Sequence, residues 1–174
     1  MSRLAIKNLF GPETLRLDIG CSRLILQSTK SATTCELPTP LKSGIPSPEA
    51  IAGLRAAIIG LSEALPAKKR ALEITLSDIL FRSWIVERLA GLATLAEIEA
   101  LADSQMRDLY GDTNEDASEW IIRVDATPFA NCWPALAIPK TLHDLLIELA
   151  GLYGWHLAKI QTRFVCGIND WRSN

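Results

Sequence analysis

The stretch LRLDIGCSRLILQ, residues 15–27, reads as two apolar strands joined at Gly20. Leucines and isoleucines alternate with other residues on both sides of the bend, which is the period of half-buried strands. An acid, Asp18, precedes the bend, and two small polar residues, Cys21 and Ser22, follow it. The stretch therefore predicts an antiparallel hairpin and raises the question of whether that hairpin binds a phosphate group.

Two interpretations of this hairpin compete. In a phosphate-binding hairpin, Gly20 would let backbone N–H groups approach phosphate oxygens, Cys21 and Ser22 would add hydrogen bonds, and Asp18 could hold a metal ion through water. In a plain turn, Gly20 would supply a positive φ and Asp18 would accept hydrogen bonds from the turn backbone. We favour the turn, because neither later strand pair offers the second Asp-x-Gly hairpin or the Gly-Gly pair of a nucleotide site.

The composition is that of an ordinary globular protein. The 174 residues are 48% hydrophobic and 22% charged, with a net charge of −2. This length suits one domain, which we expect to span residues 1–174. The 18 Lys and Arg residues are scattered, so no nucleic-acid partner is expected.

No signal peptide opens the chain, and no stretch approaches the ~20 apolar residues of a spanning helix. We therefore expect a cytoplasmic location without membrane insertion. The four cysteines and two histidines show no metal-ligand spacing. No metal ion and no cofactor are predicted, and free thiols fit a reducing compartment.

Strands and helices alternate after the hairpin. The segment 29–47 is rich in Pro, Ser and Thr and predicts an extended loop with at most an edge strand around 35–37. The expected strands are a hairpin over 71–87, a strand pair over 120–139 and a last strand over 155–165. The expected helices are 48–65, 94–111 and one from Thr141 to Gly151 or Gly154, with Ser47, Thr94 and Thr141 as N-caps.

This order predicts an α/β fold. About three helices should pack against the faces of one mixed sheet that an antiparallel run of strands opens. Such an order is that of the ribonuclease-H-like, actin-like fold, here as a single domain.

Three acids suggest an alternative function. Nucleases of that fold clamp the attacking and leaving oxygens of a phosphodiester with two metal ions, held by acids on adjacent strands. Asp18, Glu73 and Asp125 each fall on a predicted strand and could converge if their strands are neighbours. The alternative is therefore a metal-dependent hydrolase that uses Asp18, either a nuclease or an ATPase lobe that needs a partner. The absence of a basic surface argues against a polyanionic substrate.

The stretch from about 71 to 171 resembles a known family. The quoted segments are ALEITLSDILFRSWIVE, MRDLYGD, EWIIRVDATPFANCWPALAIP and GWHLAKIQTRFVCGIND. In order, they look like the actin-like assembly proteins of bacterial type IV pili and type II secretion, pilus-assembly protein M and the cytoplasmic domain of general secretion pathway protein L. The polar turn Ser77-Asp78 before the strand of Arg82, and the step Gly154-Trp155, contribute to the resemblance.

The resemblance implies a non-catalytic cytoplasmic scaffold that keeps an ATPase-like fold and binds a short peptide of an inner-membrane assembly protein. The chain would be a shortened, single-lobe relative, because it lacks the second actin-like half that closes a nucleotide cleft. A homodimer is left open.

Four residues are candidates for partner binding. Trp133 and Trp171 are the preferred candidates among five tryptophans, since Trp and Arg are frequent in interface hot spots. Arg82 and Arg123 alternate with apolar neighbours and should face solvent or a partner. Plain solvation is the commoner fate of such arginines.

Overall fold

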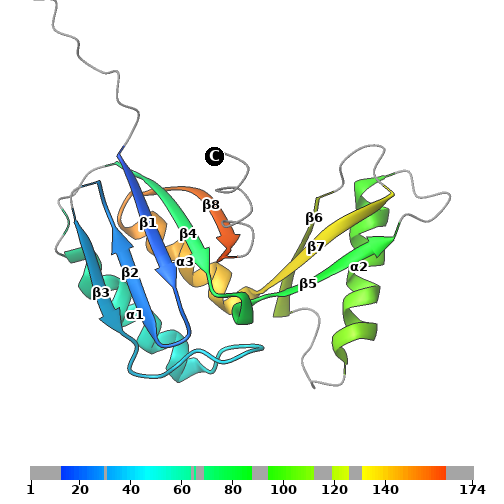
Figure 1. The fold of residues 1–174 in the computed structure, drawn as a ribbon, viewed down its shortest axis with the longest axis horizontal. Coiled ribbons are helices and arrows are strands. Elements are labelled where there is room, and N and C mark those ends of the chain that lie inside the picture. The colour runs from blue at the N-terminus through cyan, green and yellow to red at the C-terminus, as the bar shows by residue number, and fades with distance from the viewer. Residues whose placement is uncertain are drawn as a thin grey trace, which may run out of the picture.

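The computed structural model describes residues 13–29, 31–63, 65, 69–87, 94–111, 119–125 and 131–163. Within them the chain forms a five-stranded sheet, a three-stranded sheet and three α-helices (Figure 1). The first sheet has the order β3-β2-β1-β4-β8, and the second has the order β5-β7-β6. The α/β class and the mixed sheet opened by an antiparallel hairpin, both expected from the sequence, are confirmed.

The first sheet consists of β1 (Thr14–Ile19), β2 (Arg23–Gln27), β3 (Ala32–Glu36), β4 (Ala71–Leu76) and β8 (His156–Thr162). The second sheet consists of β5 (Arg82–Glu87), β6 (Trp120–Val124) and β7 (Cys132–Pro139). The helices are α1 (Pro48–Glu63), α2 (Leu95–Tyr110) and α3 (Lys140–Leu152), with a short 3₁₀ turn η1 (Asp78–Leu80) between β4 and β5.

The opening hairpin is present as predicted. β1 pairs antiparallel with β2 on one side and parallel with β4 on the other, and β8 pairs parallel with β4. The segment 29–47 is less irregular than expected, because it contains β3, which pairs antiparallel with β2. Its prolines begin at Pro38, after β3 has ended, so none of them removes a hydrogen bond from this ladder.

The predicted hairpin over 71–87 is wrong. β4 lies in the first sheet between β1 and β8, whereas β5 lies in the second sheet and pairs with β7. The turn at Ser77 and η1 carries the chain from one sheet to the other instead of folding it back. Because β4 and β5 are adjacent in sequence, a β4–β5 pair was expected. In the structure, β1 and β8 occupy both edges of β4, so β5 cannot pair with it.

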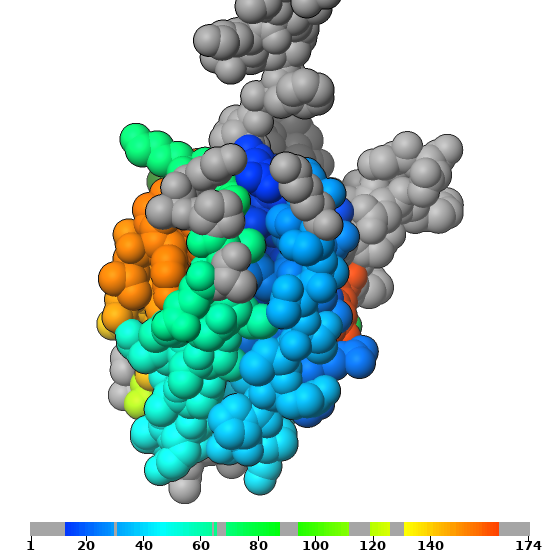
Figure 2. All heavy atoms as spheres, turned by 90° about the vertical axis from the view of Figure 1, so that its left-hand side faces the viewer, coloured from blue at the N-terminus to red at the C-terminus, as the bar shows by residue number. Residues whose placement is uncertain are grey.

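Helices α1 and α3 cover one face of the first sheet, and among the described residues no helix covers the other face (Figure 1). Figure 2 shows α1 lying between β3 and α3 on the outer side of this layer. The core between the sheet and these helices is almost wholly aliphatic and includes Leu15, Leu17, Ile19, Leu54, Ile58, Ile74, Leu142 and Leu145.

Two of the three predicted N-caps are confirmed. The backbone N–H of Ala50 donates to the hydroxyl of Ser47 at 3.3 Å, and Thr94 forms a capping box with Glu97 at the start of α2. The third is wrong, because α3 begins at Lys140 directly after β7, with Pro139 at the N-cap and no side-chain hydrogen bond. At the other end, Gly154 has a φ of 64° and its N–H donates to the Gly151 carbonyl, which ends α3.

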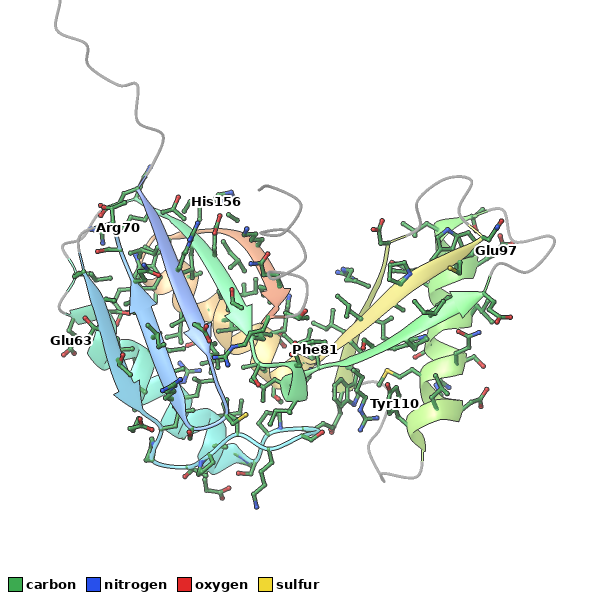
Figure 3. The ribbon with its side chains drawn as sticks, in the orientation of Figure 1. Glu63, Arg70, Phe81, Glu97, Tyr110 and His156 are labelled. Atoms are coloured by element: carbon green, nitrogen blue, oxygen red, sulfur yellow. The ribbon has the colours of Figure 1, made fainter. Side chains whose placement is uncertain are left out.

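We call the five-stranded sheet with α1 and α3 the first unit, and the three-stranded sheet with α2 the second unit. The second unit is inserted between β4 and α3, and the chain enters it at η1 and leaves it at Pro139. Figure 3 shows Phe81 at the junction and Tyr110 at the end of α2 that is nearer to it, with Glu97 at the other end. The second unit has a core of its own, which contains Trp84, Val86, Ile98, Ala102, Met106, Trp120, Trp133, Ala135 and Ala137. One domain over 1–174 remains a prediction.

Candidate functional site

The acid of the opening hairpin is paired with an arginine. Asp18 lies near the end of β1, and its carboxylate accepts a hydrogen bond from the guanidinium of Arg163 at 2.5 Å. This bond raises the pKa of Arg163 above its ordinary value. Arg163 follows β8, so it reaches Asp18 across β4. In a metal site, the Asp18 carboxylate would accept a hydrogen bond from a metal-bound water. Here it accepts one from the Arg163 guanidinium instead.

The bend of the hairpin is held by hydrogen bonds within the chain. The Gly20 N–H donates to the Arg23 carbonyl at 2.9 Å, and the carbonyls of Cys21 and Ser22 accept the backbone N–H groups of Leu41 and Leu37. The Cys21 thiol lies 3.5 Å from the Ser77 hydroxyl.

The expected positive φ at Gly20 is wrong, since among the described glycines only Gly44 and Gly154 have one. A glycine fits position 20 for a different reason. A Cβ there would lie 3.1 Å from the Arg23 carbonyl oxygen, closer than such contacts normally are.

Asp125 is placed apart from the other two acids of the hydrolase alternative, Asp18 and Glu73, whose strands β1 and β4 are neighbours. Glu73 on β4 lies between Arg16 and Lys159, at 3.4 Å and 3.5 Å, on the helix-free face of the first sheet. Asp125 follows β6 and belongs to the second unit. Within the described ranges, no group of three or more Asp, Glu, His or Cys side chains could hold a metal ion. The convergence on which that alternative depends is therefore not made by these residues.

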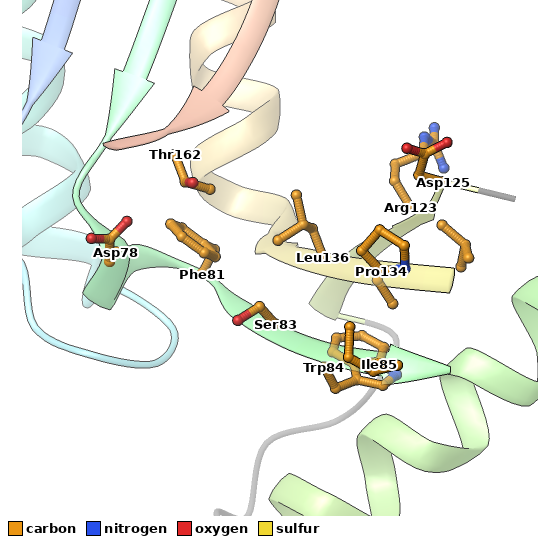
Figure 4. Close-up of a pocket in the computed structure, with 12 residues that line it drawn as sticks. Asp78, Phe81, Ser83, Trp84, Ile85, Arg123, Asp125, Pro134, Leu136 and Thr162 are labelled. Atoms are coloured by element: carbon orange, nitrogen blue, oxygen red, sulfur yellow. The ribbon is translucent and has the colours of Figure 1, made fainter. Parts of the chain in front are cut away.

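One cavity lies between the two units. It measures about 860 Å³ and is lined by Phe81, Thr162 and residues of β5, β6 and β7 (Figure 4). A second cavity of about 340 Å³ lies along β8. Phe81, Arg123, Leu136 and Thr162 line both cavities, so the two form one continuous depression. We call this depression the inter-sheet groove.

One wall of the groove is the face of the second sheet that α2 does not cover. Side chains alternate along β7, so that Trp133, Ala135 and Ala137 are buried against α2 while Pro134 and Leu136 line the groove. On β5 the same alternation buries Trp84 and leaves Ile85 57% exposed in the groove. β7 thus carries apolar side chains on both of its faces. The signal was present in CWPALAIP, where neither set of alternate positions is polar.

Of the residues predicted to bind a partner, Arg123 is exposed and lines the groove, with its guanidinium donating to the Ile122 carbonyl. Trp133 is only 5% exposed and belongs to the second core, so its choice as a surface anchor is wrong.

Arg82 does not face solvent either, because its guanidinium stacks between the rings of Tyr110 and Trp120, 4.6 Å and 4.5 Å from their centroids. An arginine between apolar neighbours in sequence can either face solvent or stack on aromatic rings. The sequence does not distinguish the two, because Tyr110 reaches Arg82 only when α2 packs on the second sheet. Trp171 lies outside the described residues.

None of the helices that the structure describes combines the length and hydropathy needed to cross a bilayer. No family model and no curated protein matches the sequence. Solved structures do match.

A chain of the PilM–PilN type IV pilus biogenesis complex superposes with a TM-score of 0.61 at 18% identity, over 92% of this chain and 50% of that one. The cytoplasmic domain of EpsL, an inner membrane component of the type II secretion system of Vibrio cholerae, superposes with a TM-score of 0.51 at 10% identity. That match covers 86% of this chain and 57% of the EpsL domain. The chain thus spans about half the length of these structures. The predicted resemblance is confirmed at the level of the fold: over about half of their length, this chain shares the fold of a component of a type IV pilus biogenesis complex and of a type II secretion system component.

Proposed function

We propose that the protein is a non-catalytic, cytoplasmic scaffold domain of an envelope assembly system, and that it binds a segment of a partner protein in the inter-sheet groove. The observation that carries the proposal is the groove itself, which leaves Ile85 and the apolar side of β7 uncovered between two units. Uncovered apolar surface in a concave site is typical of protein-binding sites.

The shared fold supports the choice of partner class. The two structures named above are components of a pilus biogenesis complex and of a secretion system. A domain of the same fold with an apolar groove fits the role of holding a partner within such a machine. The ion pair between Asp18 and Arg163 supports a non-catalytic role, since it occupies the carboxylate that a phosphate site would need.

Site-specific photo-cross-linking in the native host tests the proposal. A benzophenone amino acid placed at Ile85 should cross-link to an envelope assembly protein. The matched control is the same group at Leu109, an aliphatic residue of α2 that is 62% exposed and does not line the groove. Recovery of no assembly protein from position 85, or of the same proteins from both positions, would contradict the proposal.

Calorimetry with magnesium-ATP and with manganese tests the non-catalytic part. We expect no heat of binding with the wild-type protein or with Asp18→Ala. Binding that the wild type shows and Asp18→Ala loses would instead support the hydrolase alternative.

A further inference from the structure

The smaller cavity of the inter-sheet groove runs along the edge of β8. Its lining includes Leu157, Lys159, Ile160, Gln161 and Thr162, which are nearly consecutive. Leu157 and Ile160 pack against the first core, although they are three positions apart, because the pairing of β8 with β4 is irregular at Ala158. Lys159 approaches Glu73 on the opposite face of the sheet. The cavity therefore contacts side chains of β8 on both faces of the sheet. A cavity that does so lies beside the edge of the strand.

This edge offers backbone hydrogen-bonding groups. β8 is the last strand in the order of the first sheet, and within the described residues its only paired neighbour is β4. The outward N–H and C=O groups of an edge strand are a template for another extended segment. β8 contains seven residues, which sets the length of a segment that could pair along it.

The remaining walls of this cavity define the side chains that such a segment would need. Ile121, Leu136 and Ile138 present the apolar face of the second sheet. The charged or titratable side chains in the lining are Arg123, Lys159 and His143, and no carboxylate contributes to it. Lys159 lines this cavity and is 45% exposed, and its ammonium lies 3.5 Å from the Glu73 carboxylate. The lining of this smaller cavity is therefore apolar on one side and cationic on the other, whereas Asp78 and Asp125 line the larger cavity of the groove.

We propose that the partner segment binds as an added β-strand on the outer edge of β8, and that it alternates aliphatic with acidic residues. Its aliphatic side chains would contact Leu136 and Ile138, and its acidic side chains would lie beside Arg123 and Lys159. This inference rests on the proposed function and specifies how the same groove recognises its partner.

The probe is a capped eight-residue peptide that alternates glutamate with leucine, valine or isoleucine. A matched peptide carries lysine in place of each glutamate. Two further versions of the acidic peptide carry N-methyl groups on alternate backbone nitrogens, one on the odd positions and one on the even positions. N-methylation removes a donor, and only alternate N–H groups of an added strand face its neighbour.

We expect the acidic peptide to bind at least tenfold more tightly than the lysine peptide, by calorimetry. One N-methylated version should lose at least tenfold in affinity while the other retains it, and peptide binding should slow amide hydrogen exchange in β8. Arg123→Glu should reduce the preference for the acidic peptide. The exposed loop variant Lys42→Glu, a matched charge reversal outside the groove, should not.

Equal affinity of both N-methylated peptides, or no slowing of exchange in β8, would overturn the added strand. Equal affinity of the acidic and lysine peptides, or no binding of either, would overturn the acidic segment. None of these results affects cross-linking at Ile85, so the proposed function can stand when this inference fails. Absence of a cross-link at Ile85 is a failure of the proposed function itself.

Discussion

The cores of the two units are built from different side chains. The first core is almost wholly aliphatic, and α1 and α3 bury one whole face of its sheet. The second core contains Trp84, Trp120 and Trp133, and its sheet is covered by α2 alone. In the second core the indole N–H groups of Trp84 and Trp120 are buried and have no hydrogen-bond partner among the described residues. A buried donor without a partner costs ~1–3 kcal/mol.

This difference suggests a division of roles. The first unit contributes most of the stability. The second unit leaves an apolar sheet face open to the groove, and its core buries two indole N–H groups that have no partner among the described residues. The second unit has both of its ends held by the first, at η1 and at Pro139. Loss of the first core should therefore unfold both units, whereas damage to the second core should remain local.

The largest effect is expected from a cavity in the first core. Leu15 is fully buried on β1, and Leu15→Ala should lower the free energy of unfolding by ~2–5 kcal/mol. Urea denaturation measures the loss, and hydrogen exchange should show faster opening in both units. The exposed control Leu109→Ala should change stability by less than ~0.5 kcal/mol. Faster exchange in the first unit alone would contradict both the dependence of the second unit and the prediction of a single domain.

An intermediate effect is expected from the second core. Arg82→Met keeps the apolar stem but removes two stacked cation–aromatic contacts, with Tyr110 and Trp120, which should cost ~1–2 kcal/mol. Hydrogen exchange should accelerate in α2 and in β5 to β7 and stay unchanged in β1 and β4. The matched control is Arg123→Met, whose guanidinium lies on the groove side of the same sheet. An equal effect of the two variants would mean that the stacking of Arg82 contributes nothing.

The smallest effect is expected from the ion pair that joins the helices of the first unit. Arg55 on α1 donates to Glu148 on α3 with two bonds of 2.5 Å, and these bonds lower the pKa of Glu148 below its ordinary value of 4.5. A carboxyl with a lowered pKa in the folded state stabilises the fold above its unfolded-state pKa and loses that contribution as the pH falls through the folded value.

Thermal unfolding of Glu148→Gln against wild type should therefore show a small deficit at neutral pH that disappears in acid. The deficit should shrink with added salt, because both side chains are exposed. Glu63→Gln, at the exposed end of α1, is the control. A deficit that persisted below the folded-state pKa would show that the substitution acts through packing instead of charge.

Much of the fold could be predicted because its local signals are strong. The apolar residues on both sides of Gly20 specified β1 and β2, and the N-cap residues Ser47 and Thr94 specified where α1 and α2 begin. The 71–87 hairpin failed because pairing is a property of neighbours in space. β4 has the same alternation whether it meets β5 or β1, and only the assembled sheet decides.

The candidate site was less predictable than the fold. Arg123 was expected to face solvent or a partner, and it lines the groove. Trp133 was expected at the surface but lies in the second core, and Arg82 stacks on two aromatic rings. Asp18 was read as a metal or turn ligand, and its partner Arg163 lies 145 positions away in sequence. No local pattern reports a contact of that kind.

By itself, the sequence determined the existence and type of most elements, because backbone preferences, caps and hydrophobic periods act over a few neighbouring residues. Only the tertiary structure decided that β5, α2, β6 and β7 form a second unit, that Asp18 is paired with Arg163, and that a groove lies between the sheets. These features depend on which distant surfaces meet. That choice is made by the total burial of apolar area across the whole chain, not by any short stretch of it.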